Sequence, residues 1–261
     1  MTITSTQNQA IKELIKLKKS RERKKQGYII IEGRHEIFLA QSANVKIEKF
    51  FVCEDFSSDE NFNVILKETR AEKVSNEVFL KISNRENPDG YLAVAKAPEL
   101  SLEMIKLSKT PLVVILEAVE KPGNIGAIIR TADAVGADAI IINDPKTDIY
   151  SPNIIRASLG SIFNKQIVVA DRKSTVKWLK MNKILSYATT PAAKKVYFDC
   201  NFAKASAFLI GTEHEGLSQE WQAAADDKIK IEMNGRIDSL NASVCAAVVL
   251  FEAVRQRRKR S

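Results

Sequence analysis

The chain has 261 residues, of which 45% are hydrophobic and 28% charged, and this composition excludes collagen-like, low-complexity and wholly disordered proteins. Forty lysines and arginines against 32 aspartates and glutamates leave a net charge of +8, which favours a polyanionic partner. The length allows one large domain or two ordinary ones.

The first hundred residues predict a small α/β domain. Apolar residues at helical spacing indicate an amphipathic helix over residues 11–17 with a lysine-rich outer side, and further positive charge follows at 21–25. A short β-branched run at 28–31 predicts a buried strand, and residues 32–34 predict a turn into another helix. The other predicted elements are strands at 49–53 and 91–95 and helices near 62–69 and 77–82.

A second domain follows a polar, weakly periodic stretch at 97–111, and we divide the chain into residues 1–105 and 106–261. Short apolar runs then alternate with helical or turn-rich segments, which is typical of a mainly parallel sheet covered on both faces. The predicted strands are 112–116, 139–142, 167–169, 184–188, 207–210 and 229–231. The fold class is therefore α/β.

The last predicted helix starts near Asn241 and is followed by a basic tail. One apolar stripe runs along it, formed by Val244, Ala247, Val248, Phe251 and Val254. Its most apolar part is much shorter than the roughly 20 residues that cross a bilayer, so we expect no membrane span.

Cysteine usage and the amino terminus bear on the compartment. Cys53, Cys200 and Cys245 lie far apart without paired spacing, which predicts neither a disulfide framework nor a zinc cluster. The amino terminus lacks the apolar core of a signal peptide. We expect a cytoplasmic protein without a targeting segment.

The first of three unusual segments follows the strand at 112–116. Pro122 and Gly123 predict a turn, and Asn124 is placed to cap the helix after it. Gly126 and Arg130 are four residues apart and so share one side of that helix, where the guanidinium can reach a phosphate or a carboxylate. A capped helix with a solvated arginine explains this segment equally well.

The second segment follows the strand at 207–210, where Gly211 and Gly216 flank a Glu-His-Glu run. The two glycines permit tight turns and the close approach of a ligand. Adjacent side chains on an extended loop point in different directions, so we expect no metal site and place His214 at the surface or the rim.

The third segment is the strand at 229–231 with the polar loop after it. Ser239, Asn241 and Ser243 are good capping residues for the last helix, an interpretation that competes with function. All three segments follow predicted strands, where α/β sheets tend to bind ligands. Together they indicate a site whose backbone amides and carbonyls form hydrogen bonds with a nucleoside cofactor.

In this order the segments resemble the three motifs of the TrmH/SpoU branch of the SPOUT superfamily, which are S-adenosylmethionine-dependent RNA ribose 2′-O-methyltransferases. The matching residues are Pro122, Asn124, Gly126 and Arg130 of the first motif, Gly211, Glu213, Gly216 and Leu217 of the second, and Ile231, Met233, Gly235, Ser239, Leu240, Asn241 and Ser243 of the third. More weakly, residues 1–100 resemble the ribosomal-protein-like α/β substrate-binding domain of TrmH-family rRNA methyltransferases.

The resemblance implies a deep trefoil knot in the second domain, with S-adenosylmethionine held in the knotted region. It implies methyl transfer to a ribose 2′-hydroxyl of an RNA, which the two-domain layout suggests is rRNA. It also implies a homodimer whose apolar interface involves the helix of the first motif and the last helix.

The resemblance also assigns site residues. The catalytic positions are Arg130 with Asn124, Glu213, Ser239 and Asn241 in support, and the cofactor contacts are Gly211, Ile231 and Leu240, with Met233 and Thr189 as further candidates. A guanidinium stays protonated in nearly all proteins, so a positioning or alkoxide-stabilising role suits Arg130 better than that of a base. Glu232 stands where the family usually has proline, which predicts a less rigid cofactor loop.

RNA contacts are expected chiefly from basic side chains of the first domain and from the basic tail. The candidates are Arg21, Arg23, Lys24, Lys25, Arg34 and Arg156. Such side chains neutralise phosphates without reading sequence. Removal of residues 1–25 is therefore expected to weaken RNA binding.

Other functions remain open at this point. A non-catalytic RNA-binding or ribosome-assembly protein could keep the same fold, although the intact Asn124, Arg130, Glu213 and Asn241 argue against it. A nicotinamide-dependent oxidoreductase would require a Gly-x-Gly-x-x-Gly run after the first strand, which the sequence lacks. The sequence does not decide between rRNA and tRNA as the substrate.

Overall fold

A computed structural model describes residues 2–57, 71–213 and 215–258. The chain folds into two compact units, of which the first comprises Met1–Pro98 and Asp148–Asn164 and the second Glu99–Thr147 and Lys165–Ser261. The helix predicted near 62–69 and the rim position of His214 fall outside the described residues. Nothing in the sequence patterning indicated that residues 148–164 belong with the amino-terminal part.

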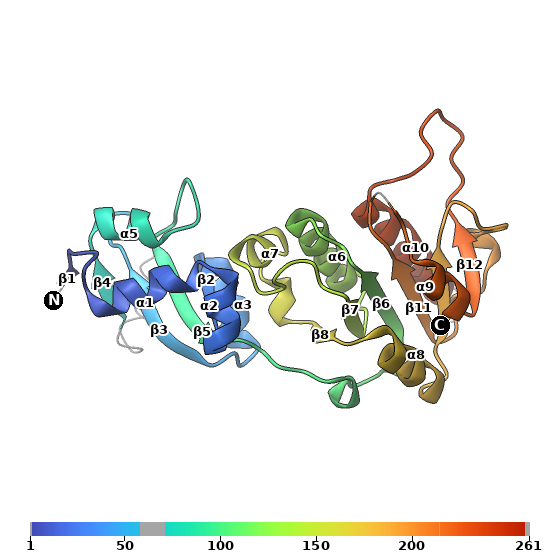
Figure 1. Ribbon diagram of the computed structural model, residues 1–261, viewed down its shortest axis with the longest axis horizontal. Helices are drawn as coiled ribbons and strands as arrows, with labels where there is room; N and C mark the ends of the chain where they lie inside the picture. Colours follow the sequence, from blue (N-terminus) through green and yellow to red (C-terminus); the bar gives the residue numbers. More distant parts are fainter. Residues whose placement is uncertain (1, 58–70, 214, 259–261) are drawn as a thin grey trace. The chain divides into compact units, whose positions relative to one another are not determined.

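The first unit is built on a five-stranded sheet in the order β1-β4-β3-β5-β2 (Figure 1). Its strands are β1 (Thr2–Ile3), β2 (Tyr28–Glu32), β3 (Ile47–Val52), β4 (Glu72–Val74) and β5 (Tyr91–Lys96). Strand β5 runs antiparallel to both β2 and β3, whereas β4 runs parallel to β1 and β3. The predicted strands β2, β3 and β5 are confirmed. The two- and three-residue strands β1 and β4 were not predicted.

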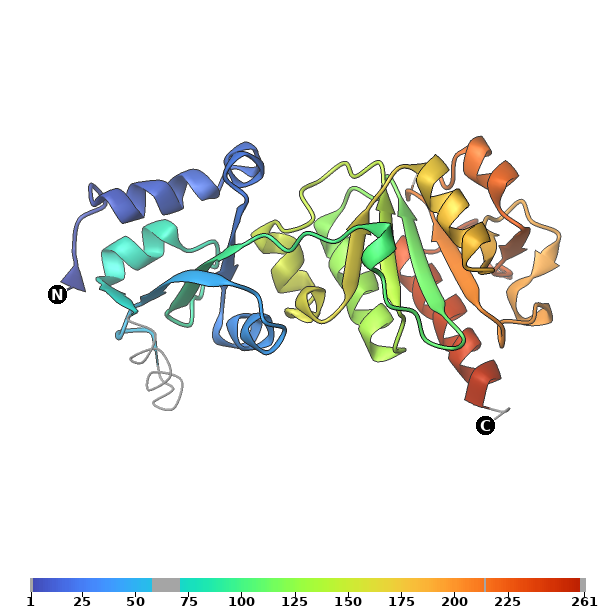
Figure 2. The ribbon, with the colours of Figure 1, turned by 90° about the horizontal axis from the view of Figure 1, so that it is seen from below.

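Helices cover both faces of this sheet. They are α1 (Gln9–Leu17), α2 (Ser20–Gln26), α3 (Arg34–Ser42) and α5 (Asn76–Ile82). Figure 2 shows α1 and α5 on one side of the sheet and α3 on the other. On the first side, α1 buries Ile11, Leu14 and Leu17 in the same core cluster as Ile30 of β2. Since a strand alternates its side chains, its neighbours Ile29 and Ile31 are buried on the α3 side.

The segment 148–164 completes the first unit. It contains α7 (Pro152–Ala157) and the 3-10 turn η2 (Ser161–Phe163). Arg23 of α2 forms an ion pair with Asp148, at 2.6 Å between Nη2 and Oδ2, and its Nη1 donates to the carbonyl oxygens of Leu17 and Lys18. Arg23 is only 6% exposed, so its guanidinium is committed inside the unit and is not presented to a phosphate as the sequence predicted.

The second unit is built on a seven-stranded sheet in the order β10-β12-β9-β11-β6-β7-β8. Its strands are β6 (Leu112–Glu117), β7 (Ala139–Asn143), β8 (Gln166–Val169), β9 (Leu185–Thr189), β10 (Lys195–Val196), β11 (Ser206–Ile210) and β12 (Asp227–Lys230). Every adjacent pair is parallel. The predicted parallel sheet and its six predicted strands are confirmed, with boundaries shifted by up to two residues.

Within the described residues, four α-helices cover the second sheet. They are α6 (Pro122–Ala134), α8 (Arg172–Met181), α9 (Gln219–Ala224) and α10 (Ala242–Arg258), with short 3-10 turns η1 (Leu102–Met104) and η3 (Tyr197–Asp199). Figure 2 shows α6 and α10 on one side of this sheet and α8 and α9 on the other. In the described part of the chain, no helix has the length and apolarity that a membrane crossing requires.

Helix α10 turns a different face to the core from the apolar stripe noted in its sequence. The buried residues of α10 are Ala242, Ala246, Val249, Leu250 and Ala253. By contrast, Val244 and Phe251 of the stripe are 47% and 54% exposed. Alanines dominate the buried face, which lets α10 pack closely on α6 and β11. Val244 and Phe251 are left on the outer face of the unit.

Candidate functional site

The three segments singled out in the sequence meet at one edge of the seven-stranded sheet. Because its strands are parallel, β6, β9, β11 and β12 all end at this edge. A cavity of about 310 Å³ lies there, a size at the lower end of the range for small-molecule sites. Seven of the predicted site residues line it: Thr189, Gly211, Glu213, Ile231, Met233, Ser239 and Leu240.

The wall after β11 is a tight loop that closes on itself. The backbone N–H of Thr212 donates to the Gly216 carbonyl at 3.0 Å, and the Gly216 N–H donates back to the Thr212 carbonyl at 3.2 Å. A Cβ atom on Gly211 would lie 2.2 Å from the Gly216 carbonyl carbon and oxygen and 2.4 Å from the Leu217 nitrogen. Glycine is therefore required at position 211, and this requirement places bare backbone against the cavity.

A chain of side-chain hydrogen bonds connects all three segments. The Asn124 amide donates to Oε1 of Glu213, and its oxygen Oδ1 accepts from Nδ2 of Asn241 at 3.1 Å. Helix α6 starts at Pro122, so Asn124 lies inside its first turn and makes no cap. The predicted capping role of Asn124 is wrong, and its amide instead joins Glu213 to Asn241.

Asn241 also fixes the start of α10. Its Oδ1 accepts from the Ser243 backbone N–H at 2.9 Å and from the Ser243 hydroxyl at 2.7 Å, and its carbonyl accepts from Cys245 at 2.9 Å. The predicted capping role of Asn241 is therefore confirmed, alongside its bond to Asn124. Glu232, which departs from the family pattern, is exposed and does not line the cavity.

The charge of the cavity is negative. Glu213, Glu215 and Asp238 line it, whereas the described lining residues include no lysine or arginine. Burial raises the pKa of the Cys245 thiol, so this lining group is neutral at physiological pH. Across the described residues, no three His, Cys, Asp or Glu side chains are grouped so that they could hold a metal ion. The arrangement suits an organic cation that is recognised largely through backbone groups.

Several residues that line the cavity have no predicted role in the site. Four of them carry side chains that can ionise or form hydrogen bonds: Glu215, Gln222, Asp238 and Cys245. Glu215 and Asp238 lie inside the motif segments and could have been found there. Gln222 and Cys245 lie on α9 and α10, and only the packing of those helices on the sheet brings them to the cavity.

The remaining predicted residues lie outside the cavity. Arg130 is exposed on α6 and does not line the cavity. In the first unit, Arg21, Lys24 and Lys25 are exposed on α2, Arg34 is exposed at the start of α3, and Arg156 is exposed on α7.

Two family profiles match separate parts of the chain, and the one that matches the carboxy-terminal part includes the segment 148–164 that packs with the first unit. The profile of the SpoU rRNA Methylase family matches residues 111–251, and that of the MRM3-like substrate binding domain matches residues 8–93. The 23S rRNA (uridine(2479)-2'-O)-methyltransferase of Streptomyces viridochromogenes is 33% identical over 74% of this chain and 70% of its own length. The 23S rRNA (guanosine(2553)-2'-O)-methyltransferase RlmP of Bacillus subtilis is 27% identical over 95% of this chain and 97% of its own length.

A solved structure has the same fold over nearly the whole chain. The SpoU methyltransferase AviRb from Streptomyces viridochromogenes, in complex with the cofactor AdoMet, superposes with a TM-score of 0.89 at 28% identity. The superposition covers 97% of this chain and 99% of that one.

Proposed function

Because the chain belongs to the SpoU rRNA methylase family, we propose that it is an S-adenosylmethionine-dependent methyltransferase acting on a ribose 2′-hydroxyl of rRNA. The observation that carries the proposal is the single cavity lined by residues of the second and third motifs and tied to the first motif through Asn124. The names of the relatives, which are 23S rRNA 2′-O-methyltransferases, support the reaction and the substrate class.

The cavity fits the cofactor in charge and in the type of lining group. S-adenosylmethionine, when bound, supplies an electrophilic methyl group on a positively charged sulfur. The carboxylates of Glu213, Glu215 and Asp238 favour such a cation, and Gly211, Ile231 and Leu240 offer backbone groups for its polar ends. Asn124 holds the Glu213 carboxylate in place, and Asn241 holds Asn124.

Methyl transfer to a ribose requires a group that positions the 2′-hydroxyl and stabilises the alkoxide as its proton leaves. We assign this role to Arg130, because a guanidinium combines a positive charge with several N–H donors. Arg130 does not line the cavity of its own subunit, so we propose that it serves the site of a partner subunit. Ser239, which lines the cavity at its rim, is proposed to contact the ribose.

A homodimer through α6 and α10 would supply that partner. The exposed stripe of α10, which includes Val244 and Phe251, supports this interface because large apolar side chains seldom gather on a surface without a partner. Phe251→Asp is expected to convert a dimer to a monomer in analytical ultracentrifugation, while Lys173→Asp on α8 leaves the dimer intact. A monomeric unaltered protein would contradict the interface.

The test of the proposed function is methyl transfer itself. Purified protein is incubated with labelled S-adenosylmethionine and either 23S rRNA or total tRNA, and the labelled nucleotides are identified after digestion. Label in a 2′-O-methylated nucleotide of 23S rRNA is expected. Label in tRNA alone would reassign the substrate, and label in neither RNA would contradict the proposal.

Gly211→Ala tests the cavity as the cofactor site. The added methyl group meets backbone atoms at 2.2 Å, a clash that no rotamer change relieves. Relief of this clash must displace the loop at 211–217, which lines the cavity, so the cofactor affinity measured by calorimetry is expected to fall about 10-fold or more. Gly235→Ala, in the third motif, is the matched control, because its Cβ would meet no atom within 4 Å and affinity should not change.

The first unit is proposed to bind rRNA and to do so in the cytoplasm, where rRNA is found. We propose residues 1–105 as the substrate-binding domain, of which residues 1–98 form the first unit together with the segment 148–164. Removal of residues 1–25 would delete Ile11, Leu14 and Leu17 from the core, so truncation cannot test the charges of this region.

A charge change on α2 isolates the electrostatic contribution. The triple variant Arg21→Gln, Lys24→Gln and Lys25→Gln removes three exposed cations and leaves the buried Arg23 in place. Affinity for 23S rRNA is expected to fall, and the slope of log affinity against log salt to decrease by about 0.9 for each phosphate that is no longer neutralised. The slope is measured by filter binding over a series of KCl concentrations. An unchanged slope would remove α2 from the RNA surface.

A further inference from the structure

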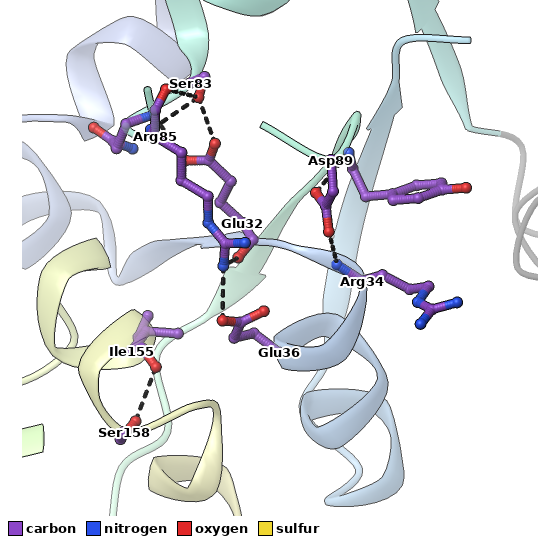
Figure 3. A network of polar contacts seen from close by, with 10 residues as sticks. Glu32, Arg34, Glu36, Ser83, Arg85, Asp89, Ile155 and Ser158 are labelled. Atoms are coloured by element: carbon purple, nitrogen blue, oxygen red, sulfur yellow. Dashed lines mark hydrogen bonds and ion pairs between the residues drawn. The ribbon is translucent and has the colours of Figure 1, made fainter. Parts of the chain in front are cut away.

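A half-buried arginine, Arg85, packs against the turn at residues 32–34 of the first unit. Nη2 of Arg85 donates to the Glu32 carbonyl oxygen at 2.6 Å and to Oε1 of Glu36 at 2.7 Å (Figure 3). A Cβ on Gly33, whose φ is +108°, would lie 2.4 Å from the same nitrogen. Glycine at position 33 therefore makes room for the Arg85 guanidinium, which gives the Glu-Gly pair of this turn a structural role.

The two buried carboxylates beside Arg85, those of Glu32 and Glu36, already have hydrogen-bond partners. The Glu32 carboxylate accepts from the Ser83 hydroxyl at 2.5 Å and from the Asn84 backbone N–H at 2.8 Å. Glu36 is paired with Arg85. The bonds from Arg85 to the Glu32 carbonyl and to the Glu36 carboxylate both use Nη2. Within the described ranges, Nε and Nη1 of Arg85 have no acceptor. Three N–H groups of a fixed guanidinium remain available.

Helix α7 brings a second arginine to the same place. A small hollow is lined by Glu32, Asn84, Arg85, Pro152, Asn153 and Arg156. Arg156 is exposed, and among the residues that the structure describes its guanidinium has no acceptor. The last turn of α7 is fixed by the Ser158 hydroxyl, which donates to the Ile155 carbonyl at 2.9 Å (Figure 3). Figure 3 also shows the Arg34 side chain directed away from Arg85, so Arg34 is not part of this cluster.

We propose that Arg85 and Arg156, with the amide of Asn153 beside them, form a binding site for one phosphate group of the RNA backbone. The proposal rests on the proposed function, because it takes RNA as the substrate. Glu36 already neutralises Arg85, so Arg156 supplies the positive charge that attracts an anion, and the free N–H groups of Arg85 supply further hydrogen-bond donors.

The size of the hollow limits how much of an anion can enter it. Its volume is about 10 Å³, which holds one oxygen atom and cannot enclose a free metabolite. The site therefore suits a group that belongs to a large molecule lying outside, with one non-bridging oxygen directed inward. A phosphodiester has that form. A phosphate bound there would contact both pieces of the first unit, through residues 84–85 of the first piece and residues 153–156 of the second.

Arg156→Ala is the primary test, since its exposed side chain carries little packing. Binding of 23S rRNA is measured over a series of KCl concentrations in the full-length protein. We expect affinity to fall about tenfold, with the salt slope reduced by about 0.7 to 0.9, which corresponds to one neutralised phosphate. Arg172→Ala on α8 is the matched control, an exposed arginine of the second unit, and should leave both values unchanged.

A second variant tests the fixed arginine. Arg85→Lys keeps the charge beside Glu36 but loses the planar fork, so RNA affinity should fall while the thermal unfolding midpoint stays close to that of the unaltered protein. If Arg156→Ala binds RNA with unaltered affinity and slope while the unaltered protein methylates 23S rRNA, the phosphate site is wrong and the proposed function stands. If the unaltered protein neither binds nor methylates RNA, the proposed function fails and the phosphate site with it.

Discussion

Arg130→Ala is expected to lower the rate of methyl transfer about a thousandfold or more while leaving cofactor affinity within about twofold of its original value. The two effects separate because Arg130 lies on the exposed side of α6 and does not line the cavity. Rates are measured from labelled methyl incorporation into 23S rRNA, and affinity by calorimetry. Near-normal turnover in this variant would remove Arg130 from the mechanism.

Mixed dimers decide which subunit the arginine serves. When Arg130→Ala subunits are combined with Gly211→Ala subunits, each mixed dimer contains one intact cavity and one intact arginine on different chains. If Arg130 serves the partner's cavity, these dimers hold one complete site and activity reappears on mixing. If it serves its own cavity, every site has a defect and mixing restores nothing. The second result would overturn the shared site but not the role of Arg130.

Arg23→Ala is expected to reduce the free energy of unfolding by about 3–5 kcal/mol, the usual cost of removing one partner of a buried ion pair. Asp148, which is 12% exposed, would be left as a nearly buried carboxylate without its cation, and the carbonyls of Leu17 and Lys18 would each lose a donor. The loss is measured by urea denaturation followed through circular dichroism.

The matched control is Lys24→Ala, one residue further along α2 and exposed. It should change the free energy of unfolding by no more than about 0.5 kcal/mol. A similar small effect from Arg23→Ala would mean that the ion pair with Asp148 contributes nothing to the fold.

Much of the fold could be predicted because hydrophobic patterning dominates it. Runs such as residues 112–116 and 139–142 are apolar throughout, and a strand buried on both faces has no other requirement. The motif residues Gly211, Ile231 and Leu240 line one cavity because parallel strands end at a common edge.

Features that depend on contacts between distant residues could not be predicted in this way. The pattern of the basic run at 21–25 predicts that all of its side chains are solvated. Arg23 is nevertheless buried, because it pairs with Asp148, which lies 125 residues later in the sequence. Asn124 is a residue type that often caps helices. Its actual partners, Glu213 and Asn241, lie near it only because the strands of the sheet end at a common edge. The turn at Lys19 between α1 and α2 contains no glycine or proline, so the sequence gives no signal that predicts it.

The discontinuity of the first unit sets an order on biosynthesis. When the ribosome has made only residues 1–98, the unit still lacks α7 and the carboxylate of Asp148 that neutralises Arg23. Its final packing must wait until β6, α6 and β7 have been translated, so the nascent amino-terminal part remains incomplete while more than sixty further residues emerge at about 5–20 residues per second.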